Sequence, residues 1–220
     1  MRTVAVLPIK RFERAKRRLE EELPPGARAS LALAMAADVM RVVSEARTVA
    51  RVLVVTGDGE ARALATELGF DVLAEPRLAG HSRAATAGVS RALVLGAERV
   101  LLLAGDCPLL RAERLDGWLA GRTGDGVVVV ADRHGTGTNA LLLAPPDAIA
   151  PAFGPGSCAR HRRLAAAAGL PVEVERVAGL DLDVDTAADL AALRHALEAD
   201  PDAAAATRAQ LASRDELASR

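Results

Sequence analysis

The stretch Val100-Leu101-Leu102-Leu103-Ala104-Gly105-Asp106 indicates how this chain folds. Five apolar residues in a row, with no polar alternation, are typical of a strand that is buried on both faces of a parallel sheet. Gly105 allows close backbone approach, and Asp106 then stands at the carboxyl end of the strand, where open α/β sheets bind their ligands. The apolar runs at 52–55 and 127–130 repeat the pattern.

Helix-forming stretches lie between the apolar runs. Ala29–Ala46 is rich in Ala, Leu and Met, whereas Glu60–Leu68, Arg83–Leu95 and Ser157–Ala168 each end before a glycine, a common helix terminator. This alternation predicts one doubly wound α/β domain over residues 1–198, a three-layer sandwich with a mostly parallel sheet. The expected strands are Val4–Pro8, Arg51–Thr56, Asp71–Leu73, Arg99–Ala104, Val127–Ala131, Ala140–Leu143 and Val172–Val177. Residues 199–220 are Ala-rich and charged, and are expected to form a C-terminal helix or a flexible tail without chemistry.

The composition excludes several classes of protein. The 220 residues carry 28 basic and 29 acidic side chains, so no strong net field attracts nucleic acid or anionic lipid. Only 2% are aromatic and none is Tyr, which disfavours binding by base stacking. The two cysteines, Cys107 and Cys158, are too few for a disulfide framework or a zinc site. Because no apolar run approaches about 20 residues, we expect a soluble cytoplasmic protein without a membrane or nucleic-acid partner.

A basic segment follows the first expected strand. Lys10, Lys16 and Arg18 lie where the strand gives way to a loop, and their charges suit a triphosphate. A solvated basic helix face is the alternative. The chain contains neither of the two commonest phosphate-binding motifs, GxxxxGK[ST] and GxGxxG.

An acidic segment lies near the end of the domain. Asp181, Asp183 and Asp185 alternate with apolar residues, which predicts that they share one face of an extended segment. Like charges on one face repel, and a metal shared between Asp106 and Asp183 or Asp185 would neutralise them. Mg²⁺ prefers one or two carboxylates together with phosphate oxygens and water. The segment is followed by a capping box over 186–189 that predicts a helix start.

Two Gly-rich segments are candidates for binding an anion. Residues 132–139 lie between two expected strands, either as an ordinary hairpin or as a source of N–H groups and Thr hydroxyls for an anion. Residues 153–158 precede a helix that Ser157 is expected to cap, and a helix N-terminus can also bind an anion. His134 has no nucleophile beside it and is expected to be a loop residue.

Together the motifs resemble those of the 2-phospho-L-lactate guanylyltransferases, also described in actinobacteria as phosphoenolpyruvate guanylyltransferases, which make the linker of the deazaflavin coenzyme F(420). The resemblance extends from about Val4 to Leu193. It rests on Pro8-x-Lys10, Ala15-Lys16-x-Arg18-Leu19, Gly105-Asp106-x-Pro108, Gly135-Thr136-Gly137-Thr138-Asn139, Phe153-Gly154-x-Gly156-Ser157 with His161, and Asp183-Val184-Asp185-Thr186.

The resemblance implies a Rossmann-like fold of the nucleotide-diphospho-sugar transferase type. It also implies attack by the phosphate of a small phospho-acid on the α-phosphorus of GTP, with Mg²⁺ as cofactor and no protein nucleophile. The implied site residues are Asp106 and Lys16 for catalysis; Asp106, Asp183 and Asp185 for the metal; Pro8, Lys10, Lys16, Arg18, Thr56, Asp58 and Ser82 for the nucleotide; and Thr138, Gly154 and Ser157 for the acid.

The chain departs from the family at one place and leaves several alternatives open. Where the family pattern is close to Gly-Leu-Asn, this chain has Gly80-His81-Ser82, so one nucleotide contact differs. The acid is phosphoenolpyruvate, 2-phospho-L-lactate or 3-phosphoglycerate, and the direct metal ligand is Asp183 or Asp185. The competing functions are a cytidylyl- or molybdopterin-type nucleotidyltransferase and a non-catalytic nucleotide-binding domain. A homodimer, and product hand-over to the downstream deazaflavin transferase, are open options for partners.

Overall fold

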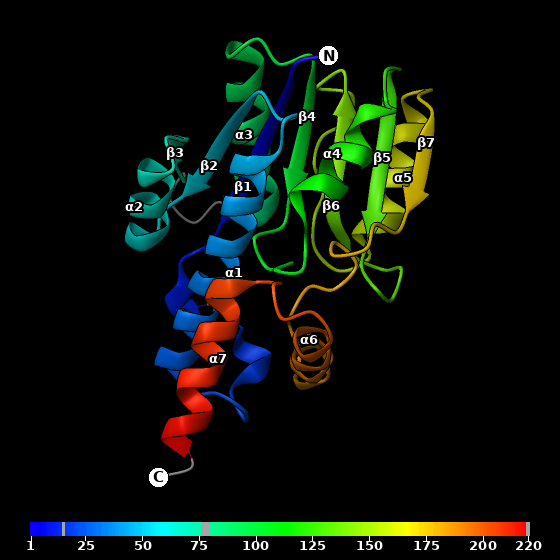
Figure 1. The fold of residues 1–220 in the computed structure, drawn as a ribbon. Coiled ribbons are helices and arrows are strands. Elements are labelled where there is room, and N and C mark those ends of the chain that lie inside the picture. The colour runs from blue at the N-terminus through cyan, green and yellow to red at the C-terminus, as the bar shows by residue number, and fades with distance from the viewer. Residues whose placement is uncertain (15, 76–79, 219–220) are drawn as a thin grey trace.

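Seven strands form one sheet in the part of the chain that the computed structural model describes, residues 1–14, 16–75 and 80–218 (Figure 1). Their order across the sheet is β3-β2-β1-β4-β6-β5-β7. The strands are β1 (Thr3–Ile9), β2 (Arg51–Thr56), β3 (Asp71–Ala74), β4 (Arg99–Leu103), β5 (Gly126–Ala131), β6 (Thr138–Ala144) and β7 (Val172–Glu175). The helices are α1 (Pro25–Glu45), α2 (Gly59–Glu67), α3 (Gly80–Val94), α4 (Ala112–Ala120), α5 (Ser157–Ala167), α6 (Ala187–Ala199) and α7 (Ala205–Ala218), with the 3-10 helices η1 (Phe12–Arg14) and η2 (Arg17–Leu19).

Most neighbouring strands run parallel, as the sequence predicts. β1 pairs in parallel with β2 and β4, β2 with β3, and β5 with β7. β6 is the exception, because it runs antiparallel to both β4 and β5. The start of β6 at Thr138 therefore lies at the same edge of the sheet as the end of β4. The backbone N–H of Ala104 donates to the carbonyl of Asn139 at 2.9 Å, which joins the two segments at that edge.

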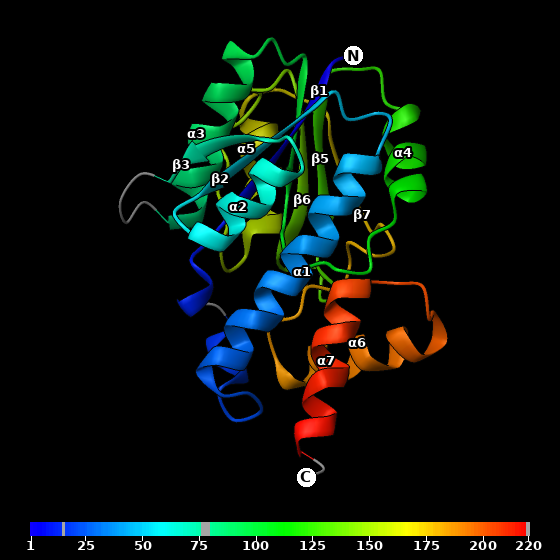
Figure 2. The ribbon, with the colours of Figure 1, turned by 60° about the vertical axis from the view of Figure 1, so that its left-hand side comes forward.

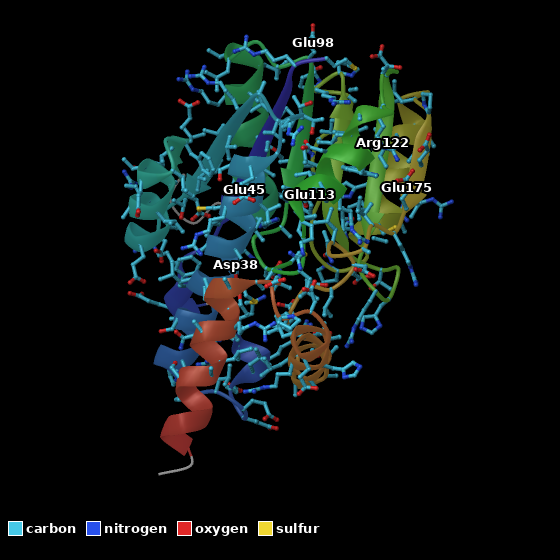
Figure 3. All side chains as sticks on the ribbon, viewed as in Figure 1. Asp38, Glu45, Glu98, Glu113, Arg122 and Glu175 are labelled. Atoms are coloured by element: carbon cyan, nitrogen blue, oxygen red, sulfur yellow. The ribbon has the colours of Figure 1, made fainter. Side chains whose placement is uncertain are left out.

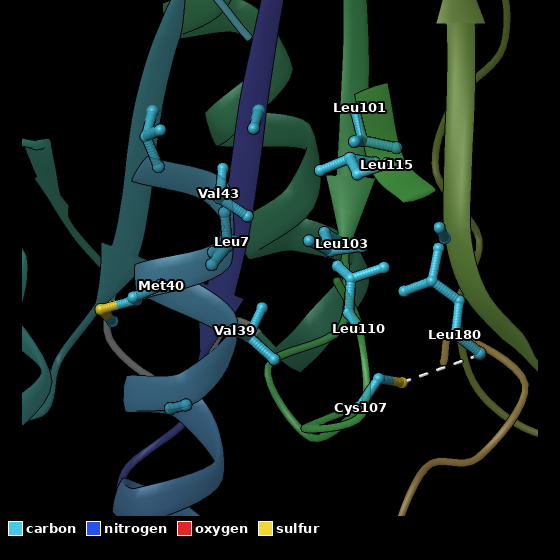
Figure 4. Close-up of a cluster of buried hydrophobic side chains, with 14 of the residues drawn as sticks. Leu7, Val39, Met40, Val43, Leu101, Leu103, Cys107, Leu110, Leu115 and Leu180 are labelled. Atoms are coloured by element: carbon cyan, nitrogen blue, oxygen red, sulfur yellow. Dashed lines mark hydrogen bonds between the residues drawn. The ribbon is translucent and has the colours of Figure 1, made fainter. Parts of the chain in front are cut away.

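Helices cover both faces of the sheet (Figures 1 and 2), which confirms the three-layer prediction. On β1, Leu7 faces the core under α1, α2 and α4, while Val6 faces the core under α3 and α5. Figure 4 shows Leu7 beside Val39 and Val43 of α1. Because an apolar layer covers each face of β1, the residues that point to either face are buried. The strand therefore does not alternate between apolar and polar residues.

A third apolar cluster joins η2 and the first half of α1 to α6 and α7. α7 begins against Asp38 of α1 (Figure 3), whose carboxylate accepts the backbone N–H groups of Ala206 and Thr207 at 3.0 and 2.8 Å. Of the two alternatives for residues 199–220, the structure has a helix, since α7 covers Ala205–Ala218 and packs on α1. The end of the α/β domain at residue 198 stays a prediction.

All the expected strands are present, and none of their ends differs from the expected position by more than two residues. α1 begins at Pro25, earlier than expected, because proline is accommodated in the first helical turn. The structure contains α4, a helix that the sequence analysis did not predict. It has nine residues and contains Gly117, so its apolar positions Ala112, Leu115 and Leu119 span too few turns to give a clear period. Of the helices formed by the described residues, none has both the length and the apolar character needed to cross a lipid bilayer.

Gly88 lets α3 approach the sheet closely. A Cβ atom at Gly88 would lie 2.3 Å from Cγ1 of Val6 and 3.2 Å from Cγ2 of Val55. We expect Gly88→Ala to lower the free energy of unfolding by about 1 to 3 kcal/mol, because the added methyl group overpacks this contact. Urea denaturation measures the change. Gly117→Ala is the matched control, since its Cβ would meet nothing within 4 Å, and it should leave stability equal or raise it by up to about 1 kcal/mol. A Gly88→Ala protein as stable as the wild type would contradict the close packing.

Candidate functional site

A cavity of about 820 Å³ opens at the edge of the sheet where β1 and β4 end and β6 begins. Its size is within the usual range for small-molecule sites. Segments that are distant in the sequence supply its walls. They include Pro8, Lys10, Lys16, Arg18, His81, Ser82, Asp106, Thr138, Asn139, Phe153, Gly154, Ser157, Asp183 and Asp185. Most of the residues implied by the family resemblance therefore meet in one place.

Two backbone turns place the acidic residues together. The turn after β4 and the segment 179–184 are joined by a hydrogen bond from the Val184 N–H to the Asp106 carbonyl at 3.3 Å. The thiol of Cys107 also faces the carbonyl of Leu180 (Figure 4), at 3.8 Å. Gly179 has φ +88°, and a Cβ there would lie 2.5 Å from the Leu109 carbonyl oxygen. Only glycine fits this approach, so Gly179 allows the acidic segment to lie against Asp106.

Lys16 lies between Asp106 and Asp185. Its Nζ atom is 2.5 Å from Oδ2 of Asp106 and 3.0 Å from Oδ1 of Asp185, and its side chain is only 5% exposed. Burial opposes the charged form, but the two carboxylates outweigh it and raise the pKa of Lys16 above its ordinary value. Burial likewise opposes ionisation of Asp106, and the Lys16 ammonium more than compensates, so the pKa of Asp106 is lowered. Lys16 and Asp106 are therefore both charged at neutral pH.

Asp183 is held by an amide rather than by a cation. The Nδ2 group of Asn139 donates to Asp183 Oδ1 at 3.1 Å and to the Leu180 carbonyl at 2.8 Å. Burial and the nearby negative charge of Asp106 raise the pKa of Asp183. Three carboxyl side chains, those of Asp106, Asp183 and Asp185, thus line the cavity, and two of them pair with the single ammonium group of Lys16.

The acidic segment differs from its expected form in one respect. Asp181 is outside the cavity lining, because its carboxylate accepts the backbone N–H of Gly179 at 2.9 Å. Asp183 and Asp185 do line the cavity. The capping box is confirmed: Thr186 and Asp189 exchange hydrogen bonds with each other's backbone N–H at the start of α6.

A second polar group in the cavity is built on two hydroxyls. The Thr138 hydroxyl is 3.0 Å from the Ser157 hydroxyl and 3.1 Å from Nδ1 of His161. Ser157 does not cap α5, contrary to expectation, because it is the first residue of the helix and its hydroxyl bonds to Thr138, while Gly156 is the N-cap. The N–H groups of Ser157 and Cys158 already donate to the carbonyls of Gly154 and Thr136. An anion here would meet hydroxyl groups rather than these two helix amides.

The residues assigned to the nucleotide divide into two groups. Five of them line the cavity, namely Pro8, Lys10, Lys16, Arg18 and Ser82. Thr56 and Asp58 do not line it.

Thr56 and Asp58 have structural contacts instead. The Asp58 carboxylate caps α2 through the N–H groups of Glu60 and Ala61, and its second oxygen accepts the N–H of Phe12 at 3.0 Å. The Thr56 hydroxyl accepts the N–H of Asp58 at 3.0 Å. These bonds attach the basic segment after β1 to α2, so the two residues support the site from outside.

Two site residues were not assigned roles from the sequence, Asn139 and His161. A polar residue at the start of the otherwise apolar strand β6 was the available signal for Asn139. His161 lies one helical turn after Ser157, on the same face of α5. His134, in contrast, is exposed in a turn, as expected.

His161 should make the protein less stable in acid. Burial, with a smaller effect of the Arg160 charge, lowers the pKa of His161 to about 4 from its ordinary 6.5. Between these values the unfolded chain binds a proton that the folded protein does not, so stability is lost as pH falls through that window. We expect a loss on the order of 2 kcal/mol from this residue.

Urea denaturation at about pH 7.5 and about pH 4.5 measures this loss. His161→Asn should lose less stability than the wild type between the two pH values. Burial also lowers the pKa of His81 to about 4. His81 is present in the wild type and in His161→Asn, so the difference between their stability losses reports His161 alone. Equal losses would contradict the assignment.

Comparisons with known proteins match this chain to guanylyltransferases. A family model described as "Guanylyl transferase CofC like" matches residues 3–198. A phosphoenolpyruvate guanylyltransferase of Conexibacter woesei is 48% identical over 215 residues, covering 96% of each chain. One from Sphaerobacter thermophilus is 40% identical over 190 residues, covering 86% of this chain and 91% of that protein.

Solved structures share the fold. A protein from Desulfovibrio desulfuricans, assigned as a nucleotide-diphospho-sugar transferase, superposes with a TM-score of 0.77 at 18% identity, covering 99% of this chain and 97% of that one. A nucleotidyl transferase from Methanothermobacter thermautotroptrophicus superposes with a TM-score of 0.65 at 20% identity, covering 90% of this chain and 99% of that one.

Proposed function

Because the chain belongs to the family of CofC-like guanylyl transferases, we propose that it is a phosphoenolpyruvate guanylyltransferase, which transfers GMP from GTP to phosphoenolpyruvate. A phosphate oxygen of the acid attacks the α-phosphorus of GTP. One P–O bond forms, the bond to the pyrophosphate group breaks, and no proton needs to move. The observation that carries the proposal is that a single cavity holds both a carboxylate–ammonium centre and a separate hydroxyl pocket.

The basic segment after β1 suits the triphosphate. Lys10 and Arg18 line the cavity together with Lys16, and their charges would offset those of the β- and γ-phosphates. Lys16 itself is paired with carboxylates, so its first role is to keep the acidic centre assembled. Such an arrangement catalyses by alignment and charge compensation, without a covalent enzyme intermediate.

The hydroxyl pocket suits the phospho-acid. Thr138 and Ser157 have hydroxyl groups in the lining of the same cavity, and Gly154, at φ +114°, lines it as well. Hydroxyl donors bind phosphate and carboxylate oxygens without the long reach of Lys or Arg. A small acid fixed there would face the α-phosphorus of a nucleotide held by the basic segment.

The donor set at the acidic centre fits a hard divalent cation. Two of its three carboxylates, those of Asp106 and Asp185, pair with the Lys16 ammonium, and no group of three or more His, Cys, Asp and Glu side chains in the described ranges is arranged to hold a metal ion. Mg²⁺ commonly takes only one or two protein carboxylates and fills its remaining positions with phosphate oxygens and water. Asp106, Asp183 and Asp185 are the residues that would hold it. When bound, it would neutralise charge on the phosphates.

A product assay tests the proposal. Purified protein is incubated with GTP, Mg²⁺ and, separately, phosphoenolpyruvate, 2-phospho-L-lactate and 3-phosphoglycerate, and pyrophosphate release is measured. The labile product is trapped with the downstream deazaflavin transferase and identified by mass spectrometry. We expect release with phosphoenolpyruvate and GTP, and little with CTP, ATP or UTP. No release with any of the three acids would overturn the proposal, and a preference for CTP would favour a cytidylyltransferase.

A further inference from the structure

A buried chain of hydrogen bonds begins behind the hydroxyl pocket. The backbone N–H of Ala152 donates to Nε2 of His161 at 2.9 Å, and Nδ1 of His161 is 3.1 Å from the Thr138 hydroxyl. The Ser157 hydroxyl is bonded to the same Thr138 oxygen at 3.0 Å. His161 is 0%, Ser157 1% and Thr138 9% exposed, so solvent does not rearrange these contacts.

Ala152 decides which ring nitrogen of His161 carries the hydrogen. A backbone N–H can only donate, so Nε2 must accept and carries no hydrogen. The neutral ring therefore has its hydrogen on Nδ1 and donates it to Thr138. A protonated ring would set its Nε2–H against the Ala152 N–H, and burial further disfavours that form by lowering the pKa of His161.

The tautomer determines how many donors the pocket offers. With the hydrogen on Nδ1, the bond between the hydroxyls of Thr138 and Ser157 uses one of their two hydrogens, and the other is left to donate into the cavity that both residues line. With the opposite tautomer, Thr138 would donate to Nδ1 and Ser157 to Thr138, and no hydroxyl hydrogen would remain. The pocket would then present oxygen lone pairs to its ligand.

We infer that His161 is a positioning residue that makes the Thr138–Ser157 pair a hydroxyl donor, and that this polarity selects the anionic group of the phospho-acid. The inference rests on the proposed function. His161 does not itself line the cavity and acts through Thr138.

The surroundings of His161 hold this arrangement in place. The ring of Phe153 packs edge-on against His161, with centroids 5.2 Å apart and an interplanar angle of 76°. Arg160 donates to the Ala152 carbonyl at 3.1 Å. This bond holds the backbone at Ala152, and the N–H of the same residue sets the tautomer of His161. The ring and its donor are thus both anchored.

Nitrogen-15 NMR of histidine-labelled protein tests the tautomer directly. The chain has four histidines, and His161→Asn identifies the signal that belongs to His161. Near neutral pH we expect a neutral ring with a protonated Nδ1 and a bare Nε2, the opposite of the form usually favoured in water. A ring protonated on Nε2 would overturn the inference. This measurement needs no turnover, so it is independent of whether the proposed function holds.

Steady-state kinetics test the consequence. His161→Leu should raise KM for phosphoenolpyruvate about tenfold, the effect of one hydrogen bond to a charged group, while KM for GTP stays within about twofold. His161→Asn, whose amide can still donate to Thr138, should recover most of the loss. His195→Leu, at an 88% exposed side chain in α6, is the matched control and should behave as wild type.

The outcomes separate the inference from the proposed function. Equal rises in KM for both substrates, or no rescue by Asn, would make His161 merely structural and overturn the inference. If wild-type protein turns over none of the acids, the proposed function fails, and with it the selection of a phospho-acid. The NMR result would then still decide the polarity of the pocket.

Discussion

Asp106→Asn is expected to lower kcat for the reaction of GTP with phosphoenolpyruvate by about 100- to 1000-fold. The substitution keeps the size of the side chain but removes its negative charge. The charge is the partner of Lys16 at 2.5 Å and one of three carboxylates proposed to hold the metal, so its loss weakens both interactions. The fold should survive, because the backbone carbonyl of Asp106, which accepts from Val184, is unchanged.

Asp181→Asn is the matched control for this prediction. It makes the same chemical change in the acidic segment, at a carboxylate that bonds to Gly179 and is outside the cavity lining. We expect its kcat to remain within about twofold of wild type, since one neutral oxygen can still accept that bond. Thermal melts of both variants verify folding. An Asp106→Asn protein with wild-type kcat would refute the role of Asp106, and equal losses in both variants would indicate a general effect of the acidic segment.

The sequence predicts the fold well because burial on both faces leaves a clear pattern. In β4, the run from Val100 to Leu103 has no polar residue, and the structure covers both of its sides. The antiparallel course of β6 has no such signal, since its residues are as fully buried as those of a parallel strand. Without that direction the sequence cannot place Thr138 beside the end of β4.

The site is harder to predict than the fold, because its contacts join distant segments. Position after a strand was enough to select Asp106, and alternation selected Asp183 and Asp185. Neither pattern indicates that Lys16, 90 residues before Asp106, inserts between two of these carboxylates. Asp58 also follows a strand, but both its oxygens accept backbone N–H groups, and its implied place beside the nucleotide stays a prediction. Only the hydrogen-bond partners distinguish the two aspartates.

Lys16→Met is expected to lower kcat by about 100-fold and also to destabilise the protein. The side chain is 5% exposed, and methionine can fill its volume without its charge. Its loss leaves Asp106, Asp183 and Asp185 facing one another. Breaking a fully buried ion pair costs about 3 to 5 kcal/mol, but Asp106 and Asp185 are 30% and 48% exposed, so we expect about 1 to 2 kcal/mol. Urea denaturation and steady-state kinetics measure the two effects.

The cause of the Lys16→Met defect can be separated into charge and packing. If repulsion among the carboxylates is the cause, Lys16→Met combined with Asp185→Asn should be more stable than Lys16→Met alone, although it should remain inactive. Added Mg²⁺ should also raise the melting temperature of Lys16→Met more than that of wild type. In the variant the divalent cation can replace the missing positive charge, whereas in wild type Lys16 already supplies that charge. If neither the second substitution nor Mg²⁺ restores stability, the loss arises from packing around the left-handed backbone of Lys16, at φ 54°, and the proposed metal site loses its support from charge.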